Sequence, residues 1–440
     1  MRRRLYALAA TLLAAWGAIG QPVLALDDPE LNETLVEVVY DGDMQSCDQC
    51  GLAASYIFEA LDIPEDRLLQ EMTAVDQLRL RLSPEEELEL ADLPGLEENG
   101  VLNVVRALEV DAPEPMVGED GYGYDGPQTV PTGYRRIGAT PGKYSDVDIA
   151  IIDTGVSHHD DLNVVGGFDC TDPKHGEDRW DVDVALHGDH TAGIAAAKDN
   201  DRFIVGPAAG ARIWSFKVLG DDGSGTYASV LCGVDQAMKH NIEVANLSLG
   251  GTNLPSECGG WDPFHNGFCH AVESGLIVVV SAGNSEMDAY NSSPANFPEV
   301  VTVSALADYD GLPGGKAPPD DSCWPCGDDD TLAAFSNYGS VVDFIAPGVS
   351  ILSTLPGNQL GRYSGTSMAA PYVTGTIAAW IADNPNYPEF AVQAVREFSM
   401  RAGGLLDDWY DDHGVDHEPL VLFGAPAPSA EQLMRWKGDL

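Results

Sequence analysis

The pattern of apolar and polar positions divides the chain into two parts. From residue 26 to about 116 the apolar stretches are short and of mixed period, and the pattern predicts, in order, a strand at 33–40, a helix at 50–61, one or two strands within 68–82, a helix at 83–93 and a strand at 101–110. Ser83 and Glu86 form a capping box at the start of the second helix. We therefore predict a small α+β, ferredoxin-like domain of the split β-α-β kind.

From residue 128 onward, longer apolar runs alternate with helical patterns. DIAIIDTG (148–155), RIWSFKVLG (212–220), EVANLSLG (243–250) and GLIVVVSAGN (275–284) are rich in Val and Ile, which is typical of strands buried on both faces of a parallel sheet. The stretches at 226–240 and 367–383 have helical periodicity. We predict an α/β fold with a doubly wound, mostly parallel sheet and helices on both faces, whose sites form at the carboxyl ends of the strands.

The segments between and after these parts carry no such periodicity. The stretch DAPEPMVGEDGYGYDGPQ (111–128) is rich in Pro, Gly and acid, and it is interpreted as a linker. The resulting domains are 26–116, then 117–402 with 117–127 as its linker. A tail at 403–440 has no recognisable motif.

Charge is the unusual feature of the composition. Seventy acidic and 23 basic side chains give a formal net charge of −47. Such a chain repels nucleic acid and anionic lipid, so we expect no nucleic-acid partner. A surface this acidic suits a protein that stays hydrated in high salt, where screening weakens its self-repulsion.

The first 25 residues have the pattern of a secretory signal peptide: a basic start, an apolar stretch, and Val23-Leu24-Ala25 as a cleavage site. A membrane anchor is the alternative, but Gln21 and Pro22 keep the apolar run below spanning length. We expect a secreted protein without a membrane segment after processing, exported by the general route in preference to the twin-arginine route.

The stretch HGDHTAG (187–193) has three interpretations. His187 and His190 share a helix face and, with Asp189, could hold a zinc ion. One histidine could instead move protons, or both could be ordinary residues at a helix start.

Three further residues have ordinary and chemical interpretations. Asp153 is the last residue of a predicted strand and is either an ordinary turn residue or a functional carboxylate. An aspartic peptidase would need two Asp-Thr-Gly motifs, and this chain has one, so that class is set aside. Ser367 in SGTSMAAP begins a helix, where it is a cap or a nucleophile beside unpaired N–H groups. Asn284 in SAGN is a turn residue or a neutral donor to an oxyanion.

Taken in the order Asp153, His187, Asn284 and Ser367, the motifs DTG, HGxHxAG, SAGN and GTSMAAP resemble those of the subtilisin-like serine peptidases, the subtilase family. The resemblance covers residues 128 to about 395. It implies that Ser367 is the nucleophile, that His187 is the general base, and that Asp153 orients the imidazole. It also implies that Asn284 helps to hold the oxyanion.

The resemblance also implies how substrate binds. VLGDDGSGTY and NLSLGG are similar to the family's two substrate-binding strands, which would pair with an extended protein or peptide substrate. The residues concerned are Gly223, Ser224, Gly225, Tyr227, Ser248, Leu249, Gly250 and Gly251. The acidic amino-terminal domain resembles the family's inhibitory propeptide, an intramolecular partner that is removed by self-processing, and we expect the protein to be a monomer.

No cofactor for catalysis is implied, but the family's structural calcium site is. Gln128, Asp161 and Asn200 match its side-chain ligands, and oxygen ligands suit calcium. Arg202 and Phe203 replace the small residues that are usual in that loop.

The eight cysteines are even in number, which favours pairing in an exported protein. Three of the expected disulfides join cysteines that are close in sequence, and the fourth joins the two cysteines that remain. For the two Cys-x-x-Cys motifs, a redox function is the alternative to a structural disulfide. The expected disulfides are Cys258–Cys269, Cys323–Cys326, Cys47–Cys50 and Cys170–Cys232.

The chain departs from the family at Asp189, where Thr is usual, and in AAPYVTG after the serine. We expect Asp189 to add to the acidic surface; the alternative is that it alters the electrostatics around His190. Two other classes of function remain as alternatives: a non-catalytic binding or scaffold protein on this fold, and a metallohydrolase built on HGDH.

Overall fold

The computed structural model describes residues 32–38, 50–93, 101–112, 119–123, 126–252, 255–319, 323, 326–402 and 418–438. Contacts divide the chain into two compact units, 1–107 and 108–440. The predicted signal peptide and Cys47, with its expected bond to Cys50, lie outside the described residues. No helix in the described ranges is long and apolar enough to cross a membrane.

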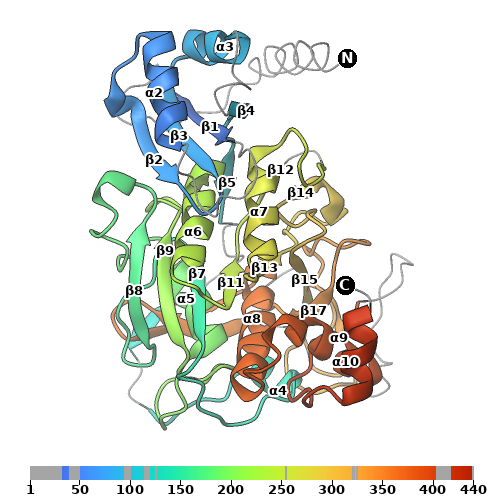
Figure 1. Cartoon of the computed structure of the whole chain (residues 1–440). Coiled ribbons are helices and arrows are strands. Elements are labelled where there is room, and N and C mark those ends of the chain that lie inside the picture. Colours follow the sequence, from blue (N-terminus) through green and yellow to red (C-terminus); the bar gives the residue numbers. More distant parts are fainter. Residues whose placement is uncertain are drawn as a thin grey trace. The chain divides into compact units, whose positions relative to one another are not determined.

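The first unit has the predicted split β-α-β topology (Figure 1). Its antiparallel sheet has the strand order β2-β3-β1-β4, and the Ser83–Glu86 capping box is formed. Leu78, Leu80 and Leu82 alternate along one strand and face the core with Ile57, as the period of two requires. The elements are β1 (Asn32–Val38), α2 (Cys50–Leu61), β2 (Leu68–Met72), β3 (Gln77–Leu82), α3 (Pro84–Asp92) and β4 (Val101–Arg106).

The second unit is built on an eight-stranded sheet of order β16-β15-β13-β11-β7-β9-β8, with β17 also paired to β15. All of its neighbouring strands are parallel except β16, which is antiparallel to β15. This confirms the predicted fold class. The strands are β7 (Asp148–Asp153), β8 (Val164–Asp169), β9 (Arg212–Lys217), β11 (Val244–Leu247), β13 (Ile277–Ser281), β15 (Val301–Ala307), β16 (Thr331–Leu332) and β17 (Phe344–Pro347).

Helices cover both faces of this sheet. On β7, Ile151 belongs to the core that includes α5 and α8, whereas its neighbour Ile152 lies against Gly233 of α6. Because successive strand residues point to opposite faces, the α5–α8 pair and the α6–α7 pair lie on opposite sides of the sheet. The helices are α4 (Thr132–Arg136), α5 (His187–Ala196), α6 (Tyr227–Lys239), α7 (Pro263–Glu273), α8 (Thr366–Asp383) and α9 (Ala391–Ala402).

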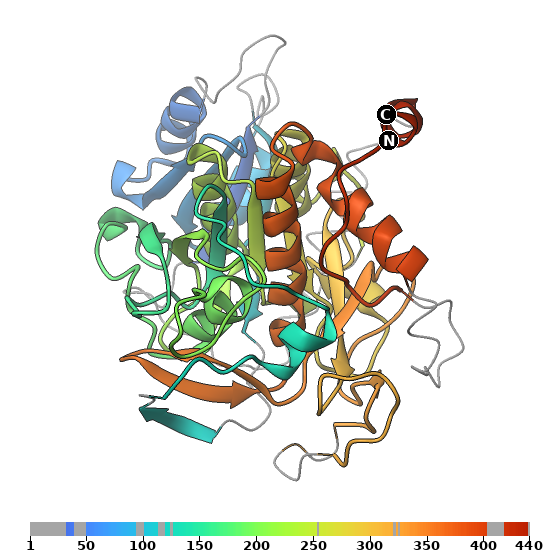
Figure 2. The ribbon, with the colours of Figure 1, turned by 90° about the horizontal axis from the view of Figure 1, so that it is seen from below.

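Smaller strands complete the second unit. β6 pairs with β19 in a three-stranded sheet, so the predicted linker at 111–128 contains a strand; backbone pairing across the sheet prevails over its Gly-rich, acidic composition. Figure 2 shows β6 in teal beside the orange hairpin of β18 and β19. These strands are β5 (Glu109–Asp111), β6 (Glu119–Gly123), β10 (Ser224–Thr226), β12 (Gly251–Thr252), β14 (Ser292–Ser293), β18 (Ile351–Leu355) and β19 (Gln359–Tyr363).

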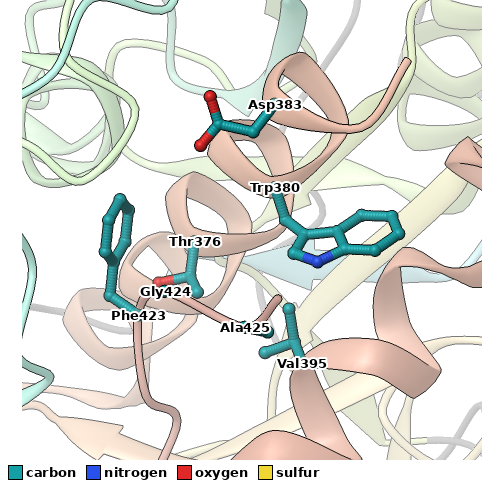
Figure 3. Close-up of a pocket in the computed structure, with 7 residues that line it drawn as sticks. All are labelled: Thr376, Trp380, Asp383, Val395, Phe423, Gly424 and Ala425. Atoms are coloured by element: carbon teal, nitrogen blue, oxygen red, sulfur yellow. The ribbon is translucent and has the colours of Figure 1, made fainter. Parts of the chain in front are cut away.

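The carboxyl-terminal segment packs onto the second unit. Leu420 bridges to Ile345 of β17, and Trp436 of α10 (Ala430–Gly438) is buried and donates its Nε1 hydrogen to Glu397 of α9 at 2.8 Å. Figure 3 shows the cavity that this segment forms with α8 and α9. It is lined by Thr376, Trp380, Asp383, Val395, Phe423, Gly424 and Ala425, none of which is a candidate site residue.

Three disulfides lie in the described part of the second unit: Cys170–Cys232, Cys258–Cys269 and Cys323–Cys326. They are three of the four pairs expected from the sequence. Cys170–Cys232 links the end of the edge strand β8 to α6, a connection of 62 residues.

Candidate active site

A buried carboxylate and an imidazole meet at the carboxyl end of β7. Asp153 is the last residue of the strand, and its Oδ1 accepts hydrogen bonds from the backbone N–H of Thr154 at 2.7 Å and from His187 Nδ1 at 2.8 Å. Both side chains are buried. The hydrogen bond to Nδ1 fixes the tautomer and leaves Nε2 as the imidazole's proton acceptor.

Glycine at 188 brings the start of α5 against β7. A Cβ at this position would overlap the carbonyl oxygen of Gly155, and the backbone N–H of Gly188 donates to Thr154 Oγ1 at 2.9 Å. The close approach places His187, the first residue of α5, beside Asp153.

The charge around His187 favours its protonated form. Burial alone lowers the pKa of His187, but the charge and hydrogen bond of Asp153 and the charge of Asp183 outweigh burial, so that the net shift is upward. Nε2 has no hydrogen-bond partner among the described residues. The raised pKa makes the imidazole a stronger base, and its Nε2 atom is free to accept a proton.

Ser367 is the second residue of α8, where backbone N–H groups lack partners within the helix. In this resting chain its Oγ donates to the carbonyl oxygen of Ser248 at 3.3 Å, while Ser248 Oγ donates to the carbonyl oxygen of Ser367 at 2.9 Å. These contacts attach the start of α8 to the segment that follows β11.

Asn284 lies next to the start of α8. Its Oδ1 accepts hydrogen bonds from the backbone N–H and the hydroxyl of Thr366, at 2.9 and 2.8 Å. With Oδ1 engaged, Nδ2 is the donor that remains, and a Cβ on Gly365 would lie 3.1 Å from it. Glycine at 365 therefore keeps the amide and Ser367 close to one another, as an oxyanion site requires.

The two predicted substrate-binding segments lie on either side of β5. β10 pairs antiparallel with it, Ser224 opposite Asp111 and Gly225 opposite Val110. On the other side, Asp111 and Gly250 exchange two backbone hydrogen bonds of 3.2 Å. The chain thus places its own extended segment where we expect an extended peptide.

The remaining predicted substrate-binding residues surround this segment. Gly223 accepts a hydrogen bond from the N–H of Ala112 through its carbonyl oxygen at 2.9 Å, and it has a positive φ of 83° that favours glycine. Tyr227 donates its N–H to Leu108 and stacks on Phe264. Leu249 is buried, and Gly251 begins β12, which pairs with β14.

The three predicted calcium ligands lie together. Asn200 Nδ2 donates to Asp161 Oδ1 at 2.8 Å, and Gln128 Nε2 donates to the carbonyl oxygens of Lys198 and Ile204, both at 2.9 Å. Burial raises the pKa of Asp161 to about 7. Turned over, the Gln128 amide would present its oxygen to the two carbonyl groups and the Asn200 amide would present its oxygen to Asp161, and calcium prefers such a set of oxygen ligands. Arg202 and Phe203 do not prevent this arrangement, because Ile204 still reaches Asp161 through its N–H at 3.2 Å.

The structure corrects the expectation for Asp189. Its side chain is fully buried and accepts hydrogen bonds from the N–H and hydroxyl of Ser157, at 2.9 and 2.6 Å, so it does not belong to the acidic surface. The turn after β7 folds back over α5 and encloses it.

The zinc interpretation of HGDH finds no geometric support. His190 Nε2 faces the carbonyl oxygen of Gly361 at 3.2 Å, and its ring stacks on Tyr363, whereas His187 faces Asp153. The two histidines therefore have different neighbours and no shared metal position.

Sequence reasoning missed two groups. Asp183 lies in an irregular segment without periodicity, yet it accepts hydrogen bonds from Thr154 and Asp189 beside the Asp153–His187 pair. Asp308 and Asp330 form ion pairs with buried Arg136 at 2.8 and 2.6 Å. Because Asp183 lies before the helix that begins at His187, no periodic spacing could have identified it.

A doubly wound sheet that carries a buried Asp–His pair and a serine at a helix start defines a serine peptidase of the subtilisin type. The model of the subtilase family matches residues 145–419, and the chain belongs to this family. It is a serine endopeptidase.

Individual relatives agree with this assignment. Subtilisin E of Bacillus subtilis (strain 168) is 33% identical over 299 residues, which cover 66% of this chain and 71% of that protein. M-protease of Shouchella clausii (strain KSM-K16) is 33% identical over 348 residues, covering 77% and 83% respectively. The crystal structure of a cold adapted subtilisin-like serine proteinase is similar with a TM-score of 0.50 and 27% identity, covering 66% of this chain and 92% of that one.

Proposed function

We propose that Asp153, His187 and Ser367 form the catalytic triad of this endopeptidase. The observation that carries the proposal is the 2.8 Å hydrogen bond from His187 Nδ1 to buried Asp153, which leaves Nε2 without a partner in the described part of the chain. Catalytic hydrogen bonds are often long in a resting enzyme, so the contact of Ser367 with Ser248 does not oppose the assignment.

In this mechanism Ser367 Oγ attacks the peptide carbonyl carbon while His187 Nε2 takes the hydroxyl proton. Asn284 Nδ2 and the N–H of Ser367 donate to the oxyanion of the tetrahedral intermediate. His187 then gives the proton to the leaving amine, and an acyl-enzyme forms. Water deacylates it by the same steps, with His187 as base again.

The substrate we propose is an extended stretch of protein. β5 supports this, because it pairs with β10 and with Gly250 through main-chain hydrogen bonds alone, and such pairing accepts many sequences. Side-chain preference would then depend on the residues around Leu249 and Asn284.

We further propose that residues 26–116 act as an intramolecular inhibitor, removed by a cut near Met116. The support is that Leu108–Ala112 takes the position of a substrate between the two binding segments. A parallel sheet depends on distant contacts and folds slowly, which gives a folding assistant a physical purpose.

Calcium at Gln128, Asp161 and Asn200 is proposed as a structural ion. With both amides turned over, Asp161 and the carbonyl oxygens of Lys198 and Ile204 would lose these donors, and a hard cation would satisfy the acceptors instead. The ion would supply charge neutralisation to the loop after α5 and takes no part in the chemistry.

Export and adaptation to high salt are proposed from the amino-terminal pattern and the net charge of −47. Circular dichroism at low and at molar salt tests the second point. Equal helix content and melting at both salts would reject it.

Replacement of the nucleophile tests the central proposal. Ser367→Ala should leave the precursor uncut and reduce turnover by roughly 10⁶, the figure measured for subtilisin. Gel analysis of the expressed chain and a serine-directed phosphonylating probe give the readouts, with exposed Ser145→Ala as the matched control. Normal self-processing or labelling in Ser367→Ala would reject the assignment, and an unlabelled native chain would favour the scaffold alternative.

A further inference from the structure

Two buried carboxyl groups lie directly behind the Asp153–His187 pair. Asp183 Oδ1 accepts from Thr154 Oγ1 at 2.8 Å, and Asp183 Oδ2 accepts from the N–H of Asp189 at 2.9 Å. Through the second of these contacts, the buried carboxyl group of Asp183 lies directly against the residue that carries the other buried carboxyl group. Two charged carboxylates side by side in a buried site repel each other strongly, which favours the retention of one proton by the pair.

The other contacts of Asp189 enclose its side chain and keep it from solvent. Both of its oxygens accept from Ser157, and its carbonyl oxygen accepts from Thr354 Oγ1 of β18 at 2.7 Å. The side chain is 0% exposed, and that of Asp183 is 5% exposed. A second full charge in this enclosure would be strongly unfavourable.

A chain of hydrogen bonds joins this pair to the catalytic groups. Thr154 Oγ1 donates to Asp183 and accepts from Gly188 N–H, while Thr154 N–H donates to Asp153. One residue therefore connects the acid pair to the carboxylate that orients His187 and to the helix start that positions it.

We propose that Asp183 and Asp189 form a buried acid pair that shares one proton and presents a single negative charge to the Asp153–His187 pair, which makes Asp189 a positioning residue for this reaction. The inference rests on the proposed role of His187. It assigns a purpose to the Asp between the two histidines, where the family usually has Thr.

The charged surroundings agree with a single negative charge. Asp153 and His187 face the pair from β7 and α5, and buried Lys217 of β9 donates to the carbonyl oxygen of Thr154 at 2.6 Å. His190 on α5 is neutral because burial lowers its pKa to about 3, with the charges of His187 and of Arg362 on β19 adding to this effect. Burial, followed by the charge of Asp183, raises the pKa of Asp189 well above its usual range.

Infrared spectroscopy tests the shared proton without reference to activity. In the full chain carrying Ser367→Ala, the difference spectrum between the parent and Asp189→Asn at pH 7 should show the C=O band of one protonated carboxylic acid, lost in the variant. Asp183→Asn should lose the same band, and Asp181→Asn, a partly exposed neighbour, should keep it. If both buried variants keep the band, the pair is wrong, even where Ser367 proves to be the nucleophile.

The pH profile of kcat/KM tests the effect on His187. Asp183→Asn/Asp189→Asn removes the single charge, so the acid limb should move about one pH unit lower. Asp189→Asn alone leaves that charge on Asp183, and its acid limb should stay in place. A purely structural role would lower kcat/KM equally at all pH values. An unmoved limb in the double variant would overturn the proposal; if the double variant does not fold, Asp183→Asn/Asp189→Thr makes the same measurement.

Discussion

Asp161 and Asp189 are both fully buried acids within the second unit, but their neighbours differ in kind. Asp161 accepts from Asn200 and from the N–H of Ile204, and the carbonyl oxygens of Lys198 and Ile204 both accept from Gln128. Asp189 is enclosed by donors from Ser157 and by a second carboxyl group, Asp183.

The difference teaches how a buried carboxylate is neutralised. An excess of oxygen acceptors favours a metal ion, whereas a second acid with a fixed set of donors favours a shared proton. In the proposed mechanism Asp153 follows a third course, since hydrogen-bond donors and the developing imidazolium of His187 would balance its charge. The roles that we propose for these three acids thus follow from their neighbours.

The largest effect should come from the acid that must stay ionised. Asp153→Asn keeps the shape but favours the wrong imidazole tautomer, and kcat should fall by about 10⁴, as in other Ser-His-Asp peptidases. Steady-state kinetics on a peptide substrate measure this, with exposed Asp146→Asn as control. A fall of less than tenfold would show that His187 does not depend on Asp153.

The calcium side of the comparison predicts a smaller effect, on stability alone. With free calcium at a hundred times its dissociation constant, binding stabilises the fold by about 2.7 kcal/mol, which is several degrees in Tm. Asp161→Asn should abolish the shift in Tm between calcium and chelator. The adjacent exposed Asp160→Asn should keep it. A shift that survives in Asp161→Asn would place the ion elsewhere.

The sequence predicted the elements whose hydrophobic periodicity is clear and the candidate site residues that lie at the ends of those elements. The continuous apolar runs predicted the parallel sheet, and each proposed triad residue lies at the end or the start of a strand or helix with clear periodicity. Asp183 was missed because it lies in an irregular segment, and Asp189 was misjudged because its burial depends on Ser157, 32 residues away. The strand β6 and the packed tail were missed for the same reason: their partners, β19 and β17, are distant in sequence.

The smallest expected effect is on the pH dependence of the free energy of unfolding. It tests whether a proton, and not a metal ion, neutralises Asp189. Burial and the charge of Asp183 raise the pKa of Asp189 in the folded chain, while the unfolded chain releases this proton near pH 4. Above that pH the folded state binds more protons than the unfolded state, so stability falls as pH rises, until the pKa of the folded pair is passed.

Asp189→Asn removes this proton-binding group and with it the loss of stability at rising pH. In the Ser367→Ala background, its free energy of unfolding relative to the parent should therefore improve by about 1.4 kcal/mol between pH 5 and pH 6, because over this range only the folded pair holds the proton and each pH unit corresponds to about 1.4 kcal/mol. Urea unfolding at the two pH values measures the difference, and Asp181→Asn serves as the partly exposed control. The difference should not respond to calcium, since the two acids are neutralised independently. A parent–variant difference that is constant with pH would mean that Asp189 carries its charge in the folded chain, and the contrast with Asp161 would then fail.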